Sequence, residues 1–230
     1  MIAPAYHRSL LSPAEQESYR KIVAGLLRHK MCIRIDQAQR EVVRRIVNAV
    51  HLDHPELYYV DYWSYHMTLS PLIKGATLHF QLMTADIEPE EVMHKLNAMA
   101  DSLQRDIKRE TSREGIYLKI AKEIGSTTKY MDTGVTWRDH TVVGPAVFHT
   151  GVCEAVAKIY LFLCQRVNVP CAIKTGTLNG TPHAWNMLEL NGSVKYVDVT
   201  AVLQTIPVYT LLPAVFFRSE QSLRSLGYDW

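Results

Sequence analysis

The chain has 230 residues, of which 47% are hydrophobic and 21% are charged, and its formal net charge is +2. This composition is ordinary for a globular protein, and the length suits one domain or a catalytic core with an extension. The near-neutral charge argues against a nucleic-acid or anionic-membrane surface, and the absence of about 18 unbroken apolar residues argues against a transmembrane helix.

The first half of the chain predicts helices and a small sheet. A helix is expected over residues 12–29, because the sequence Ser-Pro-Ala-Glu at its start supplies a cap, a first-turn proline and an acid. A second helix is expected over 36–50 from its apolar spacing. Aromatic and β-branched residues over 58–67 and 77–83 predict two paired strands.

Helical spacing of apolar residues returns further along the chain. It predicts a long helix that opens at residues 89–92 and continues to about residue 107, followed by another helix over 113–124. After residue 200 the chain contains Pro207 and Pro213, and we expect this last segment to wrap around the core.

A buried helix is predicted from Val152 to Val167, where apolar residues recur at helical spacing. Thr150 or Gly151 would cap its start, so Cys153 would lie at or near the helix N-terminus. That position stabilises a thiolate and makes a cysteine a better nucleophile at neutral pH. A lone cysteine there is more often a small buried hydrophobe, so the interpretation depends on residues further downstream.

A β-hairpin is predicted over residues 183–200. Asn191-Gly192 separates two runs of strand character, and this dipeptide is a strong hairpin signal because both residues tolerate positive φ. A two-residue turn pairs Leu190 with Ser193, and that register fixes which side chains of the two strands share a face.

In this register Trp185 lies opposite Asp198, and His183 is a diagonal neighbour of Asp198 on the same face, about 7–8 Å away between α-carbons. Two side chains can bridge that distance. Together with Cys153 they would supply a nucleophile, a base and an orienting carboxylate, as in cysteine hydrolases and acyltransferases. For His183 alone, the alternative is a buried histidine paired with a nearby acid.

At these residues the chain resembles the transglutaminase-like superfamily, in its bacterial branch. The resemblance rests on Gly151-Val152-Cys153-Glu154 with Ala157-Lys158, Val169-Pro170-Cys171, Gly176-Thr177, His183-Ala184-Trp185-Asn186 and Tyr196-Val197-Asp198-Val199-Thr200. It is close over about residues 115–200 and looser towards both ends. It implies a papain-like core, with Cys153 as nucleophile, His183 as general base and acid, and Asp198 as the partner of His183.

Two positions depart from the family's pattern. Ala155-Val156 stands where Gly-Tyr is common after the Cys-Glu pair, and Ala201 stands where an aromatic residue is frequent. Both positions are expected to shape the substrate groove, so the family's specificity is not carried over to this chain.

The resemblance also points to residues that could hold an oxyanion. In papain-like sites a polar side chain upstream of the nucleophile joins the nucleophile's backbone N–H. His140 or Thr141 occupies roughly that position, and we favour His140 over the alternative of an ordinary loop residue. Trp185, two residues after His183, is a further candidate for contact with the oxyanion or the substrate.

No cofactor or metal ion is expected. The stretch His51-Leu52-Asp53-His54 offers ligands, but no second cluster with recognisable metal spacing accompanies it. The four cysteines, Cys32, Cys153, Cys164 and Cys171, do not form a disulfide pattern, so we expect four reduced thiols of which one is reactive.

We therefore predict an α+β protein. Residues 113–230 would form a papain/transglutaminase-like core, with the catalytic helix packed on an antiparallel β-sheet. Residues 1–112 would form a helical and small-sheet extension packed on that core. The start of the chain lacks the pattern of a signal peptide, so a cytoplasmic location is expected, or secretion if a leader has been removed.

The predicted chemistry is thiol-dependent acyl transfer or hydrolysis at an amide bond through a thioester, as in a cysteine peptidase, an amidase or a protein-glutamine transglutaminase. Hydrolysis is favoured slightly, because water as acceptor needs no second protein-binding groove. We expect a protein or peptide substrate and no nucleic acid or membrane partner, and we leave self-association open.

Two alternatives are of another class. The chain could be a transglutaminase-like binding or scaffolding module that is catalytically silent. The helix that carries Arg40, Arg44 and Arg45 could instead mark a partner-docking protein, although such a basic face is more often simply solvated.

Overall fold

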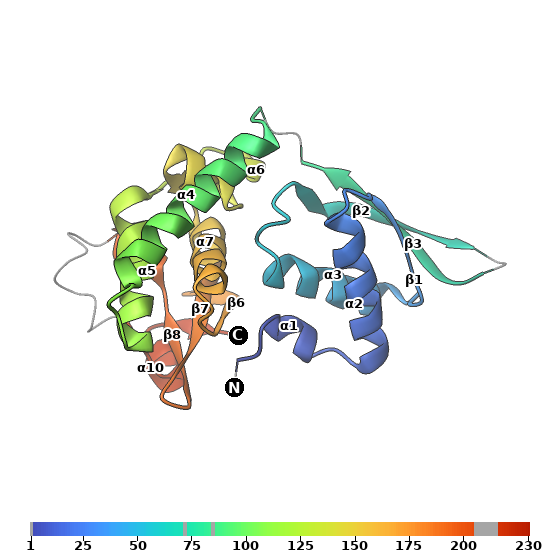
Figure 1. Cartoon of the computed structure of the whole chain (residues 1–230). Coiled ribbons are helices and arrows are strands. Elements are labelled where there is room, and N and C mark those ends of the chain that lie inside the picture. The colour runs from blue at the N-terminus through green and yellow to red at the C-terminus, as the bar shows by residue number, and fades with distance from the viewer. Residues whose placement is uncertain (1, 71–72, 84–85, 205–215) are drawn as a thin grey trace. The chain divides into compact units, whose positions relative to one another are not determined.

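The computed structural model describes residues 2–70, 73–83, 86–204 and 216–230 (Figure 1). The chain divides into two compact units, Ala5–Thr84 and a second made of Met1–Pro4 with Ala85–Trp230. These units divide after residue 84, whereas the boundary predicted from the sequence followed residue 112. The difference arises because helix α4 (Pro89–Ile107) packs against α5 (Arg113–Thr127) and α7 (Cys153–Arg166), within the unit that contains Cys153.

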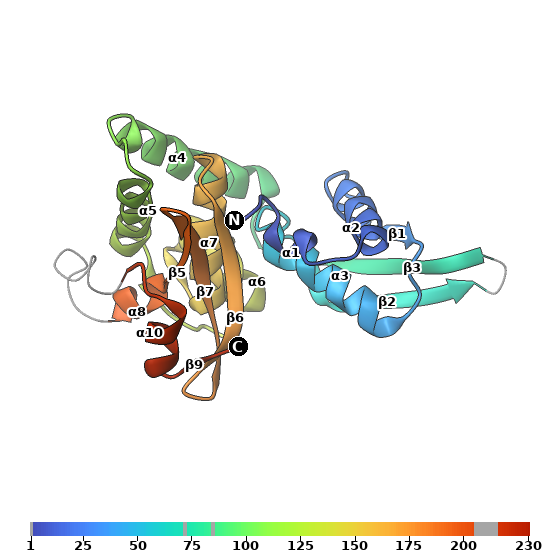
Figure 2. The same ribbon diagram turned by 90° about the horizontal axis from the view of Figure 1, so that it is seen from below.

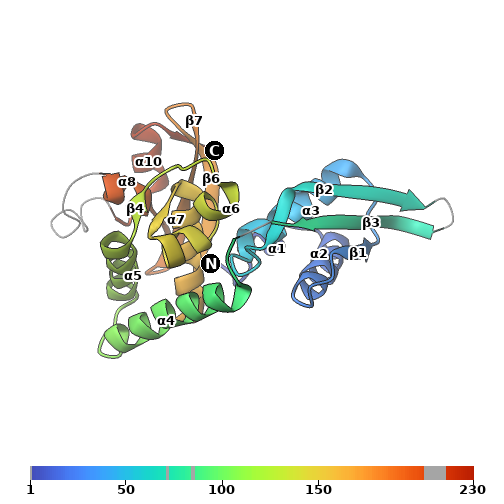
Figure 3. The ribbon, with the colours of Figure 1, turned by 90° about the horizontal axis from the view of Figure 1, so that it is seen from above.

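The unit Ala5–Thr84 packs helices on a three-stranded antiparallel sheet of order β1-β3-β2. Its elements are α1 (Tyr6–Ser9), α2 (Pro13–Leu26), β1 (Cys32–Ile35), α3 (Arg40–Asp53), β2 (Val60–Ser70) and β3 (Ile73–Leu82). Figure 3 shows the long hairpin of β2 and β3 with α3 beside β2. The two strands predicted in this region are therefore confirmed.

Both predicted helices of this unit exist, with shifted ends. Helix α2 begins with a capping box, in which the Ser12 hydroxyl accepts the Glu15 N–H and the Glu15 carboxylate accepts the Ser12 N–H. Helix α3 begins at Arg40, four residues after the predicted start at Asp36. The Asp36 carboxylate lies 2.6 Å from Lys21 Nζ, so it pairs with α2 instead of capping α3.

The unit that contains Cys153 has a four-stranded antiparallel sheet of order β8-β7-β6-β9. Besides α4, α5 and α7, its elements are β4 (Lys129–Tyr130), α6 (Thr136–Asp139), the π-helix η1 (Gly144–Phe148), β5 (Thr150–Gly151), β6 (Cys171–Leu178), β7 (Thr181–Leu190), β8 (Ser193–Val197), α8 (Val199–Gln204), α10 (Glu220–Ser225) and β9 (Tyr228–Asp229). The predicted combination of helices with antiparallel sheet is confirmed.

Helix α7 lies against β6 and β7 (Figure 2). Every residue from Ala155 to Cys164 is buried, so the helix is the centre of this unit's core. One buried polar contact fixes it to the sheet, because the Asn186 side-chain amide donates to the Ala157 carbonyl over 3.0 Å. Asn186 is 1% exposed, and removing its partner would leave a buried polar group unsatisfied.

The predicted hairpin register is confirmed. Leu190 pairs with Ser193, and Asn191 and Gly192 form the turn with φ of 52° and 73°. The second strand is shorter than predicted, because β8 ends at Val197 and helix α8 begins two residues later. Asp198 therefore lies between a strand and a helix and not inside a strand.

The end of the chain contributes strand β9, which pairs with β6 at one edge of the sheet. Gly176 of β6 makes this possible, since a Cβ there would overlap the Asp229 carbonyl oxygen and come within 3.0 Å of Trp185 and Trp230. Pro207 and Pro213, in the segment predicted to wrap the core, lie outside the described residues.

Substitution Gly176→Ala should displace β9 and lower the free energy of unfolding by about 1–3 kcal/mol, the usual cost of overpacking. Thr175→Ala, at the exposed neighbouring position of β6, should change it by no more than about 1 kcal/mol. Urea unfolding of both variants measures the difference. Equal effects would contradict the close approach of β9 to Gly176.

Candidate active site

Cys153 is the first residue of α7 and is partly exposed. The helix N-cap is Val152, in an extended conformation and without a side-chain cap bond. Thr150 and Gly151 were predicted as caps, and this was wrong. They form β5, which pairs in parallel with β4 and is thereby held in an extended conformation just before the helix.

The backbone at Cys153 favours negative charge. The N–H groups in the first turn of a helix have no intrahelical acceptor, and the helix dipole adds positive potential there. Both effects stabilise a thiolate at this position, and the backbone N–H of the residue is itself a donor for a nearby oxyanion.

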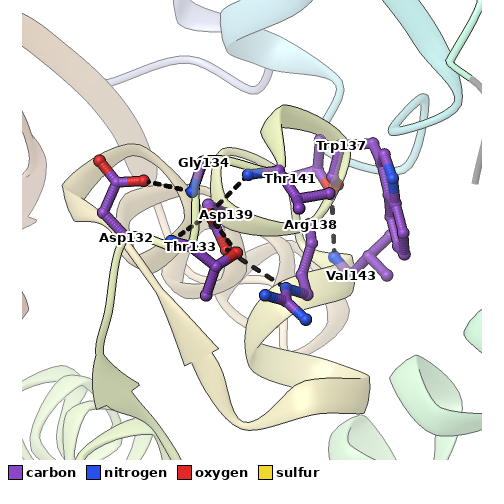
Figure 4. Close-up of polar contacts among 9 residues, drawn as sticks. Asp132, Thr133, Gly134, Trp137, Arg138, Asp139, Thr141 and Val143 are labelled. Atoms are coloured by element: carbon purple, nitrogen blue, oxygen red, sulfur yellow. Dashed lines mark hydrogen bonds and ion pairs between the residues drawn. The ribbon is translucent and has the colours of Figure 1, made fainter.

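A buried carboxylate fixes the loop that leads to α7 (Figure 4). Asp139 has no exposed surface, and its oxygens accept the Thr133 N–H at 2.6 Å, the Thr133 hydroxyl at 2.7 Å and the Val135 N–H at 3.2 Å. Burial raises the pKa of Asp139, but hydrogen bonds from Thr133, Val135 and Arg138 outweigh it and hold the pKa below its usual value. The Asp139 carbonyl accepts the Val152 N–H at 3.0 Å, which ties this loop to the helix N-cap.

His183 on β7 lies between a carboxylate and a thiol. Its Nε2 is 2.7 Å from Oδ2 of Asp198, and the Cys153 thiol lies close enough to raise the pKa of the ring. Because Nε2 faces Asp198, Nδ1 is the nitrogen left for the thiol. Burial lowers the pKa of His183, but the contacts with Asp198 and Cys153 outweigh it and raise the pKa to about 9. At neutral pH the ring is therefore protonated.

Asp198 is held by four donors. Its Oδ2 accepts the Tyr228 hydroxyl at 2.6 Å as well as His183, and its Oδ1 accepts the backbone N–H groups of Thr200 at 3.0 Å and Ala201 at 3.3 Å. The residue is only 8% exposed. The carboxylate thus has a fixed orientation, set by the first turn of α8 on one oxygen and by β9 on the other.

Tyr228 was not predicted to take part in the site. It lies 30 residues after Asp198, and it reaches the carboxylate because β9 pairs with β6. A strand of two residues carries no periodic pattern, so the sequence held no signal that could have found this contact.

Aromatic rings pack against the His183 side chain. The Trp185 ring stacks on it with centroids 5.9 Å apart and an interplanar angle of 24°, and Tyr228 and Trp230 pack edge-on against Trp185 at 5.1 and 5.5 Å. Trp185 is only 1% exposed. It therefore packs inside the core in this conformation, and its predicted contact with oxyanion or substrate stays a prediction.

His140 belongs to a closed polar network at the first turn of α7. Its Nδ1 lies 3.0 Å from one oxygen of Glu154, whose other oxygen is 2.8 Å from Lys158 Nζ. The buried Lys158 ammonium also donates to the His140 carbonyl at 3.0 Å. The hydrogen bond with Glu154 raises the pKa of His140 above its usual value. This network positions His140 next to the residue that follows Cys153.

Thr141 is less able than His140 to donate a hydrogen bond to a ligand. It is 3% exposed, its hydroxyl donates to the Trp137 carbonyl, and it accepts the Val143 N–H at 3.3 Å. The hydroxyl proton of Thr141 is therefore bound within its own loop. His140 is partly exposed and contacts Glu154 through one ring nitrogen, which leaves its second ring nitrogen for another partner.

An exposed aromatic residue also lies near the site. Tyr130 of β4 is 41% exposed, and its hydroxyl has a raised pKa, first because of partial burial and then because of nearby Cys153, Asp132 and Asp198. No sequence pattern singled out Tyr130, so the structure adds it to the residues around Cys153.

The other three cysteines lie in different surroundings. Cys164 and Cys171 are buried, and burial raises the pKa of Cys164 well above its usual value. Cys32 is exposed on β1. All four thiols are free, so partial exposure at a helix start distinguishes Cys153 from the rest.

No group of three or more histidine, cysteine or acidic side chains converges as a metal site in the part of the chain that the structure describes. Asp53 was considered from the sequence as a possible metal ligand. Its carboxylate accepts the backbone N–H groups of His7 and Arg8 and the Tyr19 hydroxyl. His54 lies 2.6 Å from Glu56. Within the same described residues, no helix has the length and apolar character needed to cross a membrane.

No family model and no curated protein matches the chain. Several solved structures, among them two candidate proteases and a TGase, are similar to parts of it. One is a candidate cysteine protease from Cytophaga hutchinsonii, with 11% identity, a TM-score of 0.38 and coverage of 60% of this chain and 61% of that one. A TGase has 12% identity, a TM-score of 0.42 and coverage of 84% and 55%.

The third is a candidate protease from Parabacteroides distasonis, with 6% identity, a TM-score of 0.37 and coverage of 60% of this chain and 35% of that one. The chain thus spans less than two thirds of the length of each of these structures. Because all three TM-scores are low, the functional assignment rests on the geometry around Cys153 and not on these similarities.

Substitution Tyr228→Phe should raise the pKa of His183, because the Asp198 oxygen that the hydroxyl shares would then interact with the imidazolium alone. Asp198→Asn should shift the pKa the other way, towards about 6.5, since it removes the negative charge. An NMR titration of the His183 ring protons measures both. An unchanged or lowered pKa in Tyr228→Phe would contradict the sharing of this oxygen.

Proposed function

We propose that the chain is a thiol enzyme that acts on the carbonyl of an amide bond in a protein or peptide. Cys153 is the nucleophile, His183 is the general base and acid, and Asp198 orients His183. The observation that carries the proposal is the position of the His183 ring, with Nε2 2.7 Å from Asp198 and the Cys153 thiol close enough to raise the pKa of the ring.

Activation of the thiol follows from two features of its surroundings. The first turn of α7 stabilises negative charge on Cys153, and the raised pKa of His183 keeps the ring protonated at neutral pH. A thiolate and an imidazolium stabilise each other, so the protonated His183 ring favours the reactive form of the nucleophile.

The first half-reaction forms a thioester. The Cys153 sulfur bonds to the carbonyl carbon, and collapse of the tetrahedral intermediate breaks the carbon–nitrogen bond while His183 gives its proton to the leaving amine. In the second half, water or a primary amine attacks the thioester carbonyl, His183 takes the proton of that nucleophile, and the thiolate leaves. The two half-reactions need only the amide substrate and the water or amine.

The oxyanion of the tetrahedral intermediate needs donors. The backbone N–H of Cys153 at the first position of α7 is one. His140 is our proposed second donor, through the ring nitrogen that Glu154 does not bind. Thr141 is less suited, because its hydroxyl already donates to Trp137.

The acceptor distinguishes an amidase or peptidase from a transglutaminase, and the first half-reaction is common to both. We retain hydrolysis as the favoured outcome, for the reason that water needs no binding groove of its own. The exposed Tyr130 ring, close to Cys153, is the side chain that we expect to contact the substrate next to the reacting bond.

The test measures turnover of glutamine-containing peptides by the full chain. Ammonia release without an added amine reports hydrolysis, and hydroxamate formation in hydroxylamine reports capture of the thioester. Cys153→Ala and His183→Ala should lower turnover by about 10³-fold or more, and Asp198→Asn by about 10²-fold or more. Cys32→Ala removes an exposed thiol elsewhere and should leave turnover unchanged.

If Cys153→Ala retained the wild-type rate on any substrate that the chain turns over, the proposed nucleophile would be wrong. If the folded wild-type chain turned over no amide and formed no covalent adduct at Cys153 with an amide or thioester probe, the catalytically silent binding module would replace this proposal.

A further inference from the structure

A groove runs along one face of the unit Ala5–Thr84, between α3 and β2. Two adjoining cavities of about 660 and 410 Å³ form it, and they share Glu41, Arg44 and Tyr65. Its lining extends along α3 from Arg40 to His51. At 1.5 Å per helical residue this length is about 16 Å, which matches about five residues of extended chain. We call it the α3–β2 groove.

The helical side of the groove is basic. Arg40, Arg44 and Arg45 line it, together with the single acid Glu41. Arg44 pairs with Glu41 at 2.8 Å, but both side chains are about three quarters exposed, and such pairs contribute little in water. Arg45 pairs with Glu15. A guanidinium has five N–H donors, so each arginine can still donate hydrogen bonds to a ligand carboxylate.

The strand side is aromatic, and a β-bulge creates it. The pairing of β2 with β3 shifts register after Asp61, whose carboxylate accepts the backbone N–H groups of Trp63 at 2.9 Å and Ser64 at 3.1 Å. The bulge directs Tyr62 and Trp63 to His51, with ring centroids 4.7 and 5.0 Å away. Trp63 remains 56% exposed and offers a flat apolar surface.

A buried hydroxyl in the lining has no partner. Tyr62 is only 8% exposed, and its hydroxyl makes no hydrogen bond within the described residues. A buried polar group left unsatisfied costs about 1–3 kcal/mol. The hydroxyl oxygen is itself inaccessible, so Tyr62 contributes its ring to the inner wall of the groove.

We propose that the α3–β2 groove binds an acidic peptide segment, with carboxylates on Arg40 and Arg44 and an aromatic or apolar side chain on Trp63. An elongated groove with one basic and one aromatic side fits an extended peptide better than a compact small molecule. A nucleic acid fits less well, because Glu41 lies among the arginines and the whole chain has a net charge of only +2. The inference does not depend on the reaction at Cys153.

The test uses fluorescence anisotropy with the fluorescein-labelled peptide Gly-Asp-Glu-Tyr-Glu-Asp-Gly and the full chain carrying Cys153→Ala, so that no turnover consumes the probe. The peptide should bind saturably and more weakly as salt rises. Arg44→Glu and Trp63→Ala should each weaken binding about tenfold or more. Arg20→Glu is the matched control, because Arg20 forms the same kind of exposed pair with Glu17, three residues away on α2, and it should change binding less than twofold.

Three results would overturn the proposal. The first is no saturable binding of this peptide by the folded chain. The second is an equal loss in Arg20→Glu and Arg44→Glu, which would mean that only overall charge matters. The third is tighter binding of a ten-nucleotide oligothymidine than of the peptide, with the same loss in Arg44→Glu, which would assign the groove to single-stranded nucleic acid. Arg40→Glu gives a second charge reversal if Arg44→Glu does not fold.

Discussion

The hydrogen bond between His183 and Asp198 is the contact on which the candidate active site depends, because it needs three backbone elements to meet at one place. Strand β7 carries His183, the junction of β8 and α8 carries Asp198, and β9 brings the Tyr228 hydroxyl to the same carboxylate oxygen. A slip of one residue in the β7–β8 pairing would move His183 to the other face of the sheet. The Asn191-Gly192 turn prevents that slip by fixing the register.

The thiol side of the site depends on burial of α7. The helix is enclosed from Ala155 to Cys164, so its first residue has little freedom to move relative to β7. Before the helix, the buried Asp139 carboxylate organises the loop, and the Asp139 carbonyl holds the helix N-cap. Glu154 and Lys158 tie His140 to the first helical turn. In the proposed reaction, groups fixed in this way would act on the carbonyl without first having to reorganise.

Much of this arrangement could be predicted from the sequence, and the rest could not for physical reasons. Helical periodicity predicted α7, and the Asn-Gly turn predicted the hairpin that puts His183 and Asp198 on one face. The sequence did not indicate that Asp198 leaves the strand to begin α8, because capping and strand propensity compete at that residue. Tyr228 reaches Asp198 because β9 pairs with β6, and Trp63 reaches the α3–β2 groove because the pairing of β2 with β3 shifts register. Neither feature leaves a periodic signal in the sequence.

The most direct test of the account is the alkylation rate of each cysteine against pH, measured by mass spectrometry in the wild type and in His183→Ala. With the His183 pKa near 9, the imidazolium persists through neutral pH, so Cys153 should react far faster than Cys32 below pH 7 and lose that advantage without His183. The buried Cys164 and Cys171 should react slowly in both forms. A Cys153 that reacted no faster than Cys32, or that kept its rate in His183→Ala, would contradict the thiolate–imidazolium pair.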